Sequence, residues 1–149
     1  MDLLKRDKVA YFCSRQYAPK AVLASYDWAT AQRDKVIIST FHSPLERDVM
    51  DFLLQKKRPI IYVLPARMYR RVPIRFREAI TEGRLLLVSL QSDSQCRSCQ
   101  RYANQAANYI LSIVSEIVFG SIASGSNTDK LYSSLNTDGF HGRILKIIS

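Results

Sequence analysis

The sequence predicts an α/β protein of the Rossmann-like class: a three-layer sandwich with a mostly parallel sheet of about six strands and helices on both faces. Short, continuous apolar runs alternate with helix-like segments along the chain, and strands of a parallel sheet covered on both faces have this composition. The 149 residues suit one domain of ordinary size. Since no linker or internal repeat marks a boundary, we expect a single domain over residues 1–149.

The first half of the chain is expected to hold three strands and two helices. Ser43 precedes Pro44, which suits a first helical position, and Glu46 completes a capping-box pattern with Ser43. These three residues therefore predict the start of the second helix. The predicted strands are Lys8–Cys13, Val36–Ser39 and Pro59–Leu64, and the predicted helices cover Ala18–Arg33 and the segment from Ser43 to Lys57.

The second half continues the alternation after an irregular basic segment that begins at Arg67. Gly83 suits a helix C-cap, which predicts that the third helix ends just before it. The expected helices are Pro73–Thr81, Arg97–Val114 with an apolar stripe, and a short one near Asp129–Leu135. The expected strands are Leu85–Ser89, Glu116–Ala123 and Ile144–Ile148.

In such sheets, ligands bind at loops outside the carboxyl ends of the strands, near the point where the strand order reverses. The loop that contains Gly125, Ser126 and Thr128 is the best phosphate candidate, because a small turn before a helix presents backbone N–H groups and positive potential. The alternative is a plain turn in which Asn127 or Thr128 caps the helix.

Two side chains at the preceding loops suit the same anion. Arg15 follows the first strand, and a guanidinium binds phosphate in a bidentate manner. His42 lies in the loop after the second strand, where it can donate a hydrogen bond or take part in acid–base chemistry. A solvent-exposed arginine and a surface or packing histidine are the alternatives, and no serine–histidine–acid arrangement is visible in the sequence.

The chain is basic, with 22 lysines and arginines against 13 acidic residues and a formal charge of +9. This balance favours polyanionic partners. Aromatic residues Tyr69 and Phe76 are interleaved with a cluster of arginines, which is typical of a path for single-stranded nucleic acid. The alternative is a solvated helix face, partly paired by Glu78 and Glu82. The expected nucleic-acid-binding residues are Arg67, Arg70, Arg71 and Arg75.

The sequence favours neither export nor metal chemistry. No signal peptide opens the chain and no apolar run is long enough to cross a membrane, so we expect a cytoplasmic protein with reduced thiols and no membrane partner. Cys96 and Cys99 form a lone Cys-x-x-Cys pair without a recognisable second pair of zinc ligands. We therefore expect no metal and no cofactor.

Several segments in series resemble the Rossmann-like domain of the DNA processing protein A family. This family is related to the lysine-decarboxylase-like "Lonely guy" proteins, a wider group that contains many nucleotide-binding domains. The resemblance covers roughly Val9 to Leu131. The matching segments are Cys13-Ser14-Arg15, Ile38-Ser-Thr-Phe-His-Ser-Pro-Leu-Glu46, Pro59-Ile-Ile-Tyr-Val-Leu-Pro-Ala-Arg67, Gly83-Arg-Leu-Leu-Leu-Val-Ser89 and Gly125-Ser-Asn-Thr-Asp129.

The resemblance implies a basic cleft that binds single-stranded DNA, and full-length family members help to load a recombinase during natural transformation of bacteria. Ser39-Thr40 stands where the family usually has Ser-Gly, and Gly125-Ser-Asn-Thr-Asp129 stands where it commonly has Gly-Gly-x-Thr-Glu. Glu46 is expected to cap its helix. Carried over by position, the residues that line the site are Ser14, Arg15, Ser39, Phe41, His42, Ser43, Arg67, Gly125 and Thr128.

Three functions stay open on the sequence alone. The leading one is a module that binds single-stranded DNA or a nucleotide phosphate. The second is a sensor of a nucleotide-derived signal, for which a homodimer is one arrangement. The third is a nucleotide phosphoribohydrolase, whose Pro-Gly-Gly-x-Gly-Thr-x-x-Glu loop does not occur here. We therefore expect a binding protein rather than an enzyme.

Overall fold

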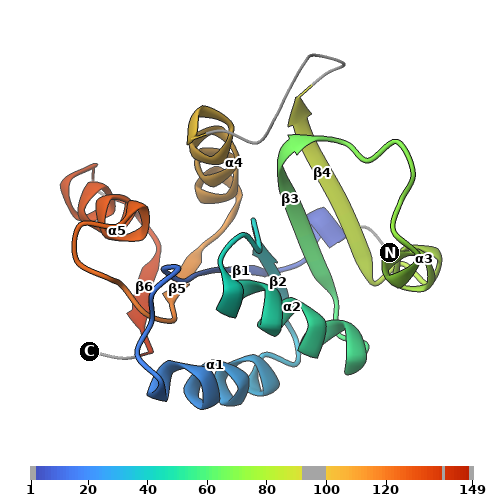
Figure 1. The fold of residues 1–149 in the computed structure, drawn as a ribbon, viewed down its shortest axis with the longest axis horizontal. Coiled ribbons are helices and arrows are strands. Elements are labelled where there is room, and N and C mark those ends of the chain that lie inside the picture. Colours follow the sequence, from blue (N-terminus) through green and yellow to red (C-terminus); the bar gives the residue numbers. More distant parts are fainter. Residues whose placement is uncertain (1–2, 92–99, 139, 148–149) are drawn as a thin grey trace.

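A computed structural model describes residues 3–91, 100–138 and 140–147. Within them, six strands form one sheet in the order β4-β3-β2-β1-β5-β6, and every neighbouring pair is parallel. The predicted α/β, Rossmann-like class is therefore confirmed (Figure 1). The strands are β1 (Lys8–Phe12), β2 (Val36–Ser39), β3 (Ile60–Arg67), β4 (Leu85–Gln91), β5 (Glu116–Phe119) and β6 (Arg143–Lys146).

Helices cover both faces of the sheet (Figure 1). One apolar cluster joins one face to the first three helices, and a second cluster joins the other face to the last two. The helices are α1 (Lys20–Ala31), α2 (Pro44–Gln55), α3 (Ile74–Thr81), α4 (Gln100–Ile113) and α5 (Asn127–Asp138), and a short 3₁₀ helix, η1 (Leu3–Lys5), precedes β1.

The central strands are apolar on both faces because each face packs against helices. In β1, Val9 and Tyr11 belong to the first cluster, whereas Ala10 and Phe12 belong to the second. Each of these four side chains is at most 5% exposed, as expected for a parallel sheet between two layers of helices. This explains why continuous apolar runs predicted the strands.

Several predicted boundaries differ from the observed ones. β5 ends at Phe119 rather than Ala123, because β1 ends at Phe12, its partner in register. β3 continues to Arg67, and its pairing with β4 shifts between Leu64 and Arg67. Pro65 lies in this irregular stretch, and a proline cannot donate the N–H that a regular ladder needs. α5 is longer than the predicted Asp129–Leu135, while β6 is centred one to two residues earlier than predicted.

The strand order reverses between β1 and β5, and the two strands meet closely there. Gly120, just after β5, donates its N–H to the carbonyl of Phe12 at 2.8 Å. A Cβ at Gly120 would collide with the hydroxyl of Tyr11, so this position favours glycine. None of the helices in the described parts of the chain is long and apolar enough to cross a membrane.

Candidate functional site

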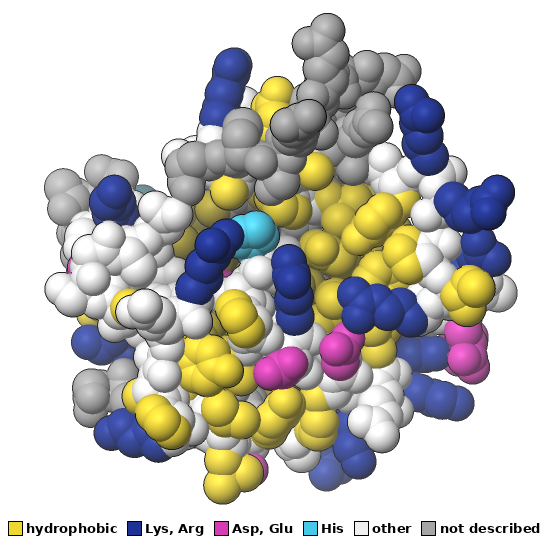
Figure 2. Space-filling view, in the orientation of Figure 1, with side chains coloured by type: hydrophobic (Ala, Val, Ile, Leu, Met, Phe, Trp, Pro, Cys, Tyr) yellow, Lys and Arg dark blue, Asp and Glu magenta, His cyan; other side chains and the backbone are white. Residues whose placement is uncertain are grey.

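A cleft of about 1230 Å³ opens at the carboxyl ends of β1, β2 and β5, where the strand order reverses. Loops after these three strands form its floor and one side, and helices α4 and α5 form the remaining walls. The predicted site residues that line it are Ser14, Arg15, His42, Ser43, Gly125, Ser126 and Thr128. Figure 2 shows a histidine near the middle of one face, with lysine or arginine side chains on either side of it.

Two serine hydroxyls meet at the floor of the cleft. Ser14 and Ser126 lie 3.1 Å apart through their Oγ atoms. The Oγ of Ser14 accepts the N–H of Ala123 at 2.8 Å, and the Oγ of Ser126 accepts the N–H of Asp129 at 3.1 Å. Whichever serine accepts from the other then has both lone pairs occupied and keeps its proton. The pair therefore always has one hydroxyl hydrogen to donate to a ligand.

Ser126 also starts α5. Its side chain accepts the Asp129 N–H and its carbonyl accepts the Lys130 N–H at 3.0 Å, so Ser126 is the N-cap, and the alternative of Asn127 or Thr128 as N-cap is wrong. The Asp129 carboxylate accepts the N–H of Gly125 at 2.9 Å. Gly125 has a positive φ of 78°, which favours glycine there. These contacts fix the loop and aim the amino end of a 12-residue helix at the cleft.

Buried side chains hold the conformation of the loop after β2. Ser39 Oγ accepts the N–H of Phe41 at 3.1 Å, and Phe41 adopts an unusual positive φ of 43°. Both side chains are fully buried and neither lines the cleft. Ser39 and Phe41, which the family resemblance assigns to the site, therefore shape the loop from below.

Glu46 is a buried carboxylate that ties two loops of the cleft together. It is 4% exposed, and its two oxygens accept the N–H groups of Cys13 and His42, each at 2.8 Å. The Thr40 hydroxyl lies 3.4 Å from Oε1, and Ser43 Oγ accepts the Glu46 N–H at 3.4 Å. Burial raises the pKa of Glu46, whereas the backbone N–H donors act in the opposite direction. The predicted capping pattern of Ser43 and Glu46 is thus confirmed, and the carboxylate also reaches Cys13, just after β1.

Arg15 and His42 are hydrogen-bonded at the mouth of the cleft. Arg15 Nη2 lies 3.1 Å from His42 Nε2, and since a guanidinium only donates, Nε2 must be the acceptor in a neutral ring. Burial lowers the pKa of His42, and the charges of Arg15 and Arg47 lower it further. Neutral His42 therefore orients Arg15, while the guanidinium stays exposed and keeps donors for an anion.

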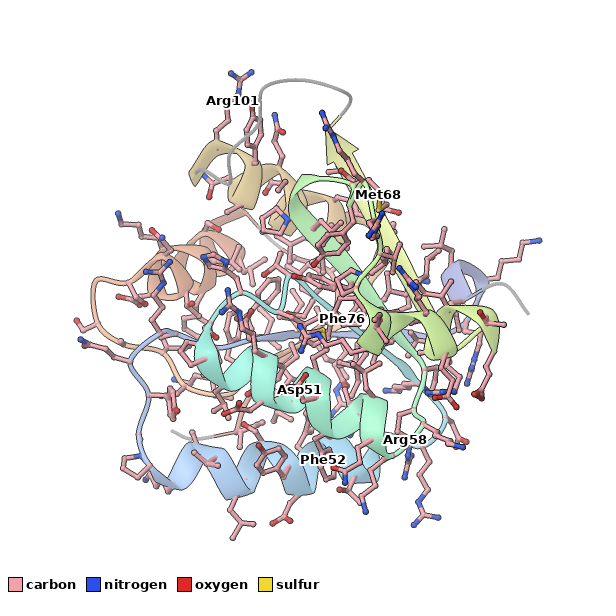
Figure 3. The ribbon with its side chains drawn as sticks, turned by 45° about the vertical axis from the view of Figure 1, so that its right-hand side comes forward. Asp51, Phe52, Arg58, Met68, Phe76 and Arg101 are labelled. Atoms are coloured by element: carbon pink, nitrogen blue, oxygen red, sulfur yellow. The ribbon has the colours of Figure 1, made fainter. Side chains whose placement is uncertain are left out.

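Three members of the predicted arginine cluster, Arg70, Arg71 and Arg75, do not line the cleft. Arg67 ends β3, and Arg70 and Arg71 are exposed in the segment between β3 and α3. Arg75 on α3 forms an ion pair with Asp51 of α2, 2.9 Å between Nη1 and Oδ1. Phe76 of α3 (Figure 3) is fully buried and packs against Tyr62 of β3. It is therefore not available to stack on bases, contrary to the interleaving proposed from the sequence.

The side chains on two walls of the cleft were not predicted from the sequence as site residues. Asn104 and Asn108, one turn apart on α4, face the cleft beside Ala103 and Ala107, and Lys130 lies on α5. The signal was present as two asparagines at i, i+4 spacing next to the apolar stripe of α4. Cys96 and Cys99 lie outside the described residues. Within the described residues, no group of three or more metal-ligating side chains is positioned to hold an ion.

Two solved structures have the same fold as this chain. DNA processing protein A (DprA) from Streptococcus pneumoniae matches with a TM-score of 0.74 at 14% sequence identity, over 97% of this chain and 51% of that chain. DNA processing protein A from Helicobacter pylori, studied for its single-stranded DNA binding mode, matches with a TM-score of 0.73 at 14% identity, over 97% of this chain and 66% of that chain.

This chain therefore spans about half of the first neighbour and two thirds of the second. No protein-family model matches the chain, and no curated protein matches it in sequence. The likeness rests on the arrangement of the strands and helices, which extends over nearly the whole chain. We conclude from this likeness that the protein has the Rossmann-like fold of DNA processing protein A.

Proposed function

We propose that this chain binds single-stranded DNA, with backbone phosphates held in the cleft between the ends of β1 and β5. The proposal is based on one observation: several hydrogen-bond donors converge on the cleft. The Ser14–Ser126 pair keeps one hydroxyl hydrogen, Arg15 is oriented by His42, and the amino end of α5 faces the same space.

The acidic groups nearby do not oppose an anion strongly. The Glu46 oxygens accept the N–H groups of Cys13 and His42, and Asp129 accepts the N–H of Gly125. Lys130 adds a positive charge to the wall. The polar part of the cleft therefore offers an anion mainly N–H and O–H donors and positive charge, which suits phosphate.

The size of the cleft favours a polymer over a single nucleotide. Its volume is about 1230 Å³, whereas sites for small molecules usually measure about 300–1,000 Å³. The formal charge of +9 adds long-range attraction for a polyanion. The fold neighbour from Helicobacter pylori, which binds single-stranded DNA, supports the same choice.

Fluorescence anisotropy with a labelled oligothymidylate, at low and at physiological salt, tests this proposal. Arg15→Gln and Ser126→Ala should weaken binding. Arg33→Gln is the matched control. It removes an exposed charge in the loop between α1 and β2, at the amino ends of the strands and away from the cleft. No binding by the wild type at low salt would overturn the proposal. Equal affinity for thymidine monophosphate would instead favour a nucleotide sensor.

A further inference from the structure

Four aromatic rings form a chain on the α2–α3 side of the sheet, outside the cleft. Tyr62 on β3 packs edge-on against Phe41 at 5.6 Å and against Phe76 at 6.0 Å between ring centroids. Tyr69, in the segment after β3, lies 6.2 Å from Phe76. Phe41 and Phe76 are fully buried, whereas Tyr62 and Tyr69 are half-buried. The two tyrosines are therefore held from below by fixed rings while part of each remains accessible.

Two arginines frame these tyrosines. The Arg75 guanidinium lies 4.6 Å from the centre of the Phe76 ring and is also fixed by Asp51. Arg47 is exposed on the first turns of α2. Burial raises the pKa of Tyr62, and the charges of Arg47 and Arg75 act against this rise. Both charges therefore act at Tyr62.

Arg47 connects this region with the cleft. Its charge contributes to the lowered pKa of His42, after burial and Arg15, and also acts on Tyr62. The charge of Arg47 therefore acts both on His42 in the cleft and on Tyr62 outside it. We define the aromatic surface as Tyr62, Tyr69, Arg47 and Arg75.

We infer that the aromatic surface is a second contact site for nucleic acid, where bases of a strand leaving the cleft stack on Tyr69 and Tyr62 while Arg47 and Arg75 attract its backbone. This inference rests on the proposed function. Accessible aromatic rings among cations are the means by which proteins bind single strands without reading sequence. Phosphate alone would gain little from the tyrosines, and an apolar protein surface would have to desolvate both arginines.

The inference predicts that affinity grows with strand length. We expect a dinucleotide to stay within the cleft, whereas a longer strand gains the stacking contacts. Tyr69→Leu keeps an apolar side chain against Phe76 and removes the accessible ring. It should weaken a long oligothymidylate about tenfold or more and leave the dinucleotide unchanged, and Tyr69→Phe should bind like the wild type.

The control is Tyr26→Leu, since Tyr26 is also half-buried and lies 5.0 Å from the ring of Phe52. Its neighbours are Asp48 and Asp51, whose charges raise its pKa after burial. A second measurement uses an oligonucleotide that carries 5-bromodeoxyuridine, which on irradiation should cross-link to Tyr62 or Tyr69 and be located by mass spectrometry.

The outcomes separate the two proposals. If neither length binds the wild type, the proposed function fails and this inference fails with it. If the dinucleotide binds and length adds nothing, or if Tyr26→Leu weakens long strands as much as Tyr69→Leu, the aromatic surface is no nucleic-acid site while the cleft proposal stands. Cross-links confined to other residues would also overturn the inference.

Discussion

The Glu46 carboxylate accepts a hydrogen bond from the backbone N–H of Cys13, 33 residues earlier in the chain, at 2.8 Å. The same carboxylate accepts the N–H of His42 at 2.8 Å. Glu46 thus fastens the end of β1 to the loop after β2, and both segments carry residues of the cleft. The contact is buried, so water cannot easily replace either bond.

We expect Glu46→Ala to destabilise the fold by about 3 kcal/mol, because it leaves two buried N–H groups without an acceptor. Chemical denaturation followed by circular dichroism measures this loss. Asp48→Ala, at an exposed position on the same helix, should change the free energy of unfolding little. Equal effects of the two substitutions would contradict the role given to Glu46.

Gly120→Ala is expected to cost about 1–3 kcal/mol, since its methyl group would meet the Tyr11 hydroxyl. That hydroxyl is 2.8 Å from Ser25 Oγ in the buried interior. Tyr11→Phe removes the colliding atom, so the double variant should lose less stability than the sum of the two single variants. Thermal unfolding of all four proteins completes the cycle, and strict additivity would count against the clash.

Cys13 is expected to resist alkylation in the folded protein. Burial raises the pKa of its thiol to about 12, and the charge of Glu46 adds to the rise, so very little thiolate forms at neutral pH. In a Cys96→Ser/Cys99→Ser variant, iodoacetamide should label Cys13 quickly only after denaturation. Rapid labelling of the native protein would show that β1 opens readily at its end.

DNA affinity is expected to rise as pH falls through the range just below the usual histidine pKa. Burial and the neighbouring Arg15 and Arg47 hold the pKa of His42 low in the free protein. A bound phosphate offsets that repulsion, and it replaces the His42 ring as the acceptor for the Arg15 guanidinium, so His42 can be protonated in the complex. Binding therefore takes up a proton, so the affinity should rise by at most about tenfold for each unit by which the pH falls. Titrations at several pH values should show this slope in the wild type and lose it in His42→Gln.

Without DNA, the same histidine predicts the opposite trend for stability. A lowered pKa in the folded state means that the unfolded chain binds more protons, so the free energy of unfolding falls as pH drops from the usual histidine pKa toward the lowered one. Denaturation at matched pH values should therefore show a smaller pH dependence in His42→Gln than in the wild type.

The salt dependence of DNA binding should report each phosphate contact. For single strands, the slope of log K against log salt changes by about 0.7 per neutralised phosphate. Arg15→Gln should therefore make the slope shallower by about that amount, whereas Arg33→Gln should leave it unchanged. Identical slopes for wild type and Arg15→Gln would place Arg15 away from the backbone of the strand.

Local sequence was sufficient to predict the strands and helices, but their ends depend on partners. β5 stops at Phe119 because β1 stops at Phe12, and no pattern within Glu116–Ala123 contains that information. The start of α5 depends on Ser126, whose hydroxyl is held by Ser14, 112 residues earlier. Long-range contacts of this kind set boundaries that local propensity leaves open.

The site was predictable to the extent that topology places loops together. Residues at the ends of β1, β2 and β5 had to meet, and Ser14, Arg15, His42 and Ser126 do line one cleft. Ser39 and Phe41 belong to the same loops but face the interior, because a loop's side-chain directions follow from its dihedral angles. The walls from α4 were overlooked since its periodicity was used only to find the core-facing stripe.

The reversal of strand order at β1 and β5 makes the cleft a seam between two parts of the chain. One side comes from the segments around Ser14 and His42, and the other from α4 and the loop before α5. The cleft forms only when β5 pairs with β1, so a strand of DNA bound across it would contact both parts of the chain and hold them together. Bound DNA would therefore slow the separation of β5 from β1 and shift the folding equilibrium toward the folded state by mass action.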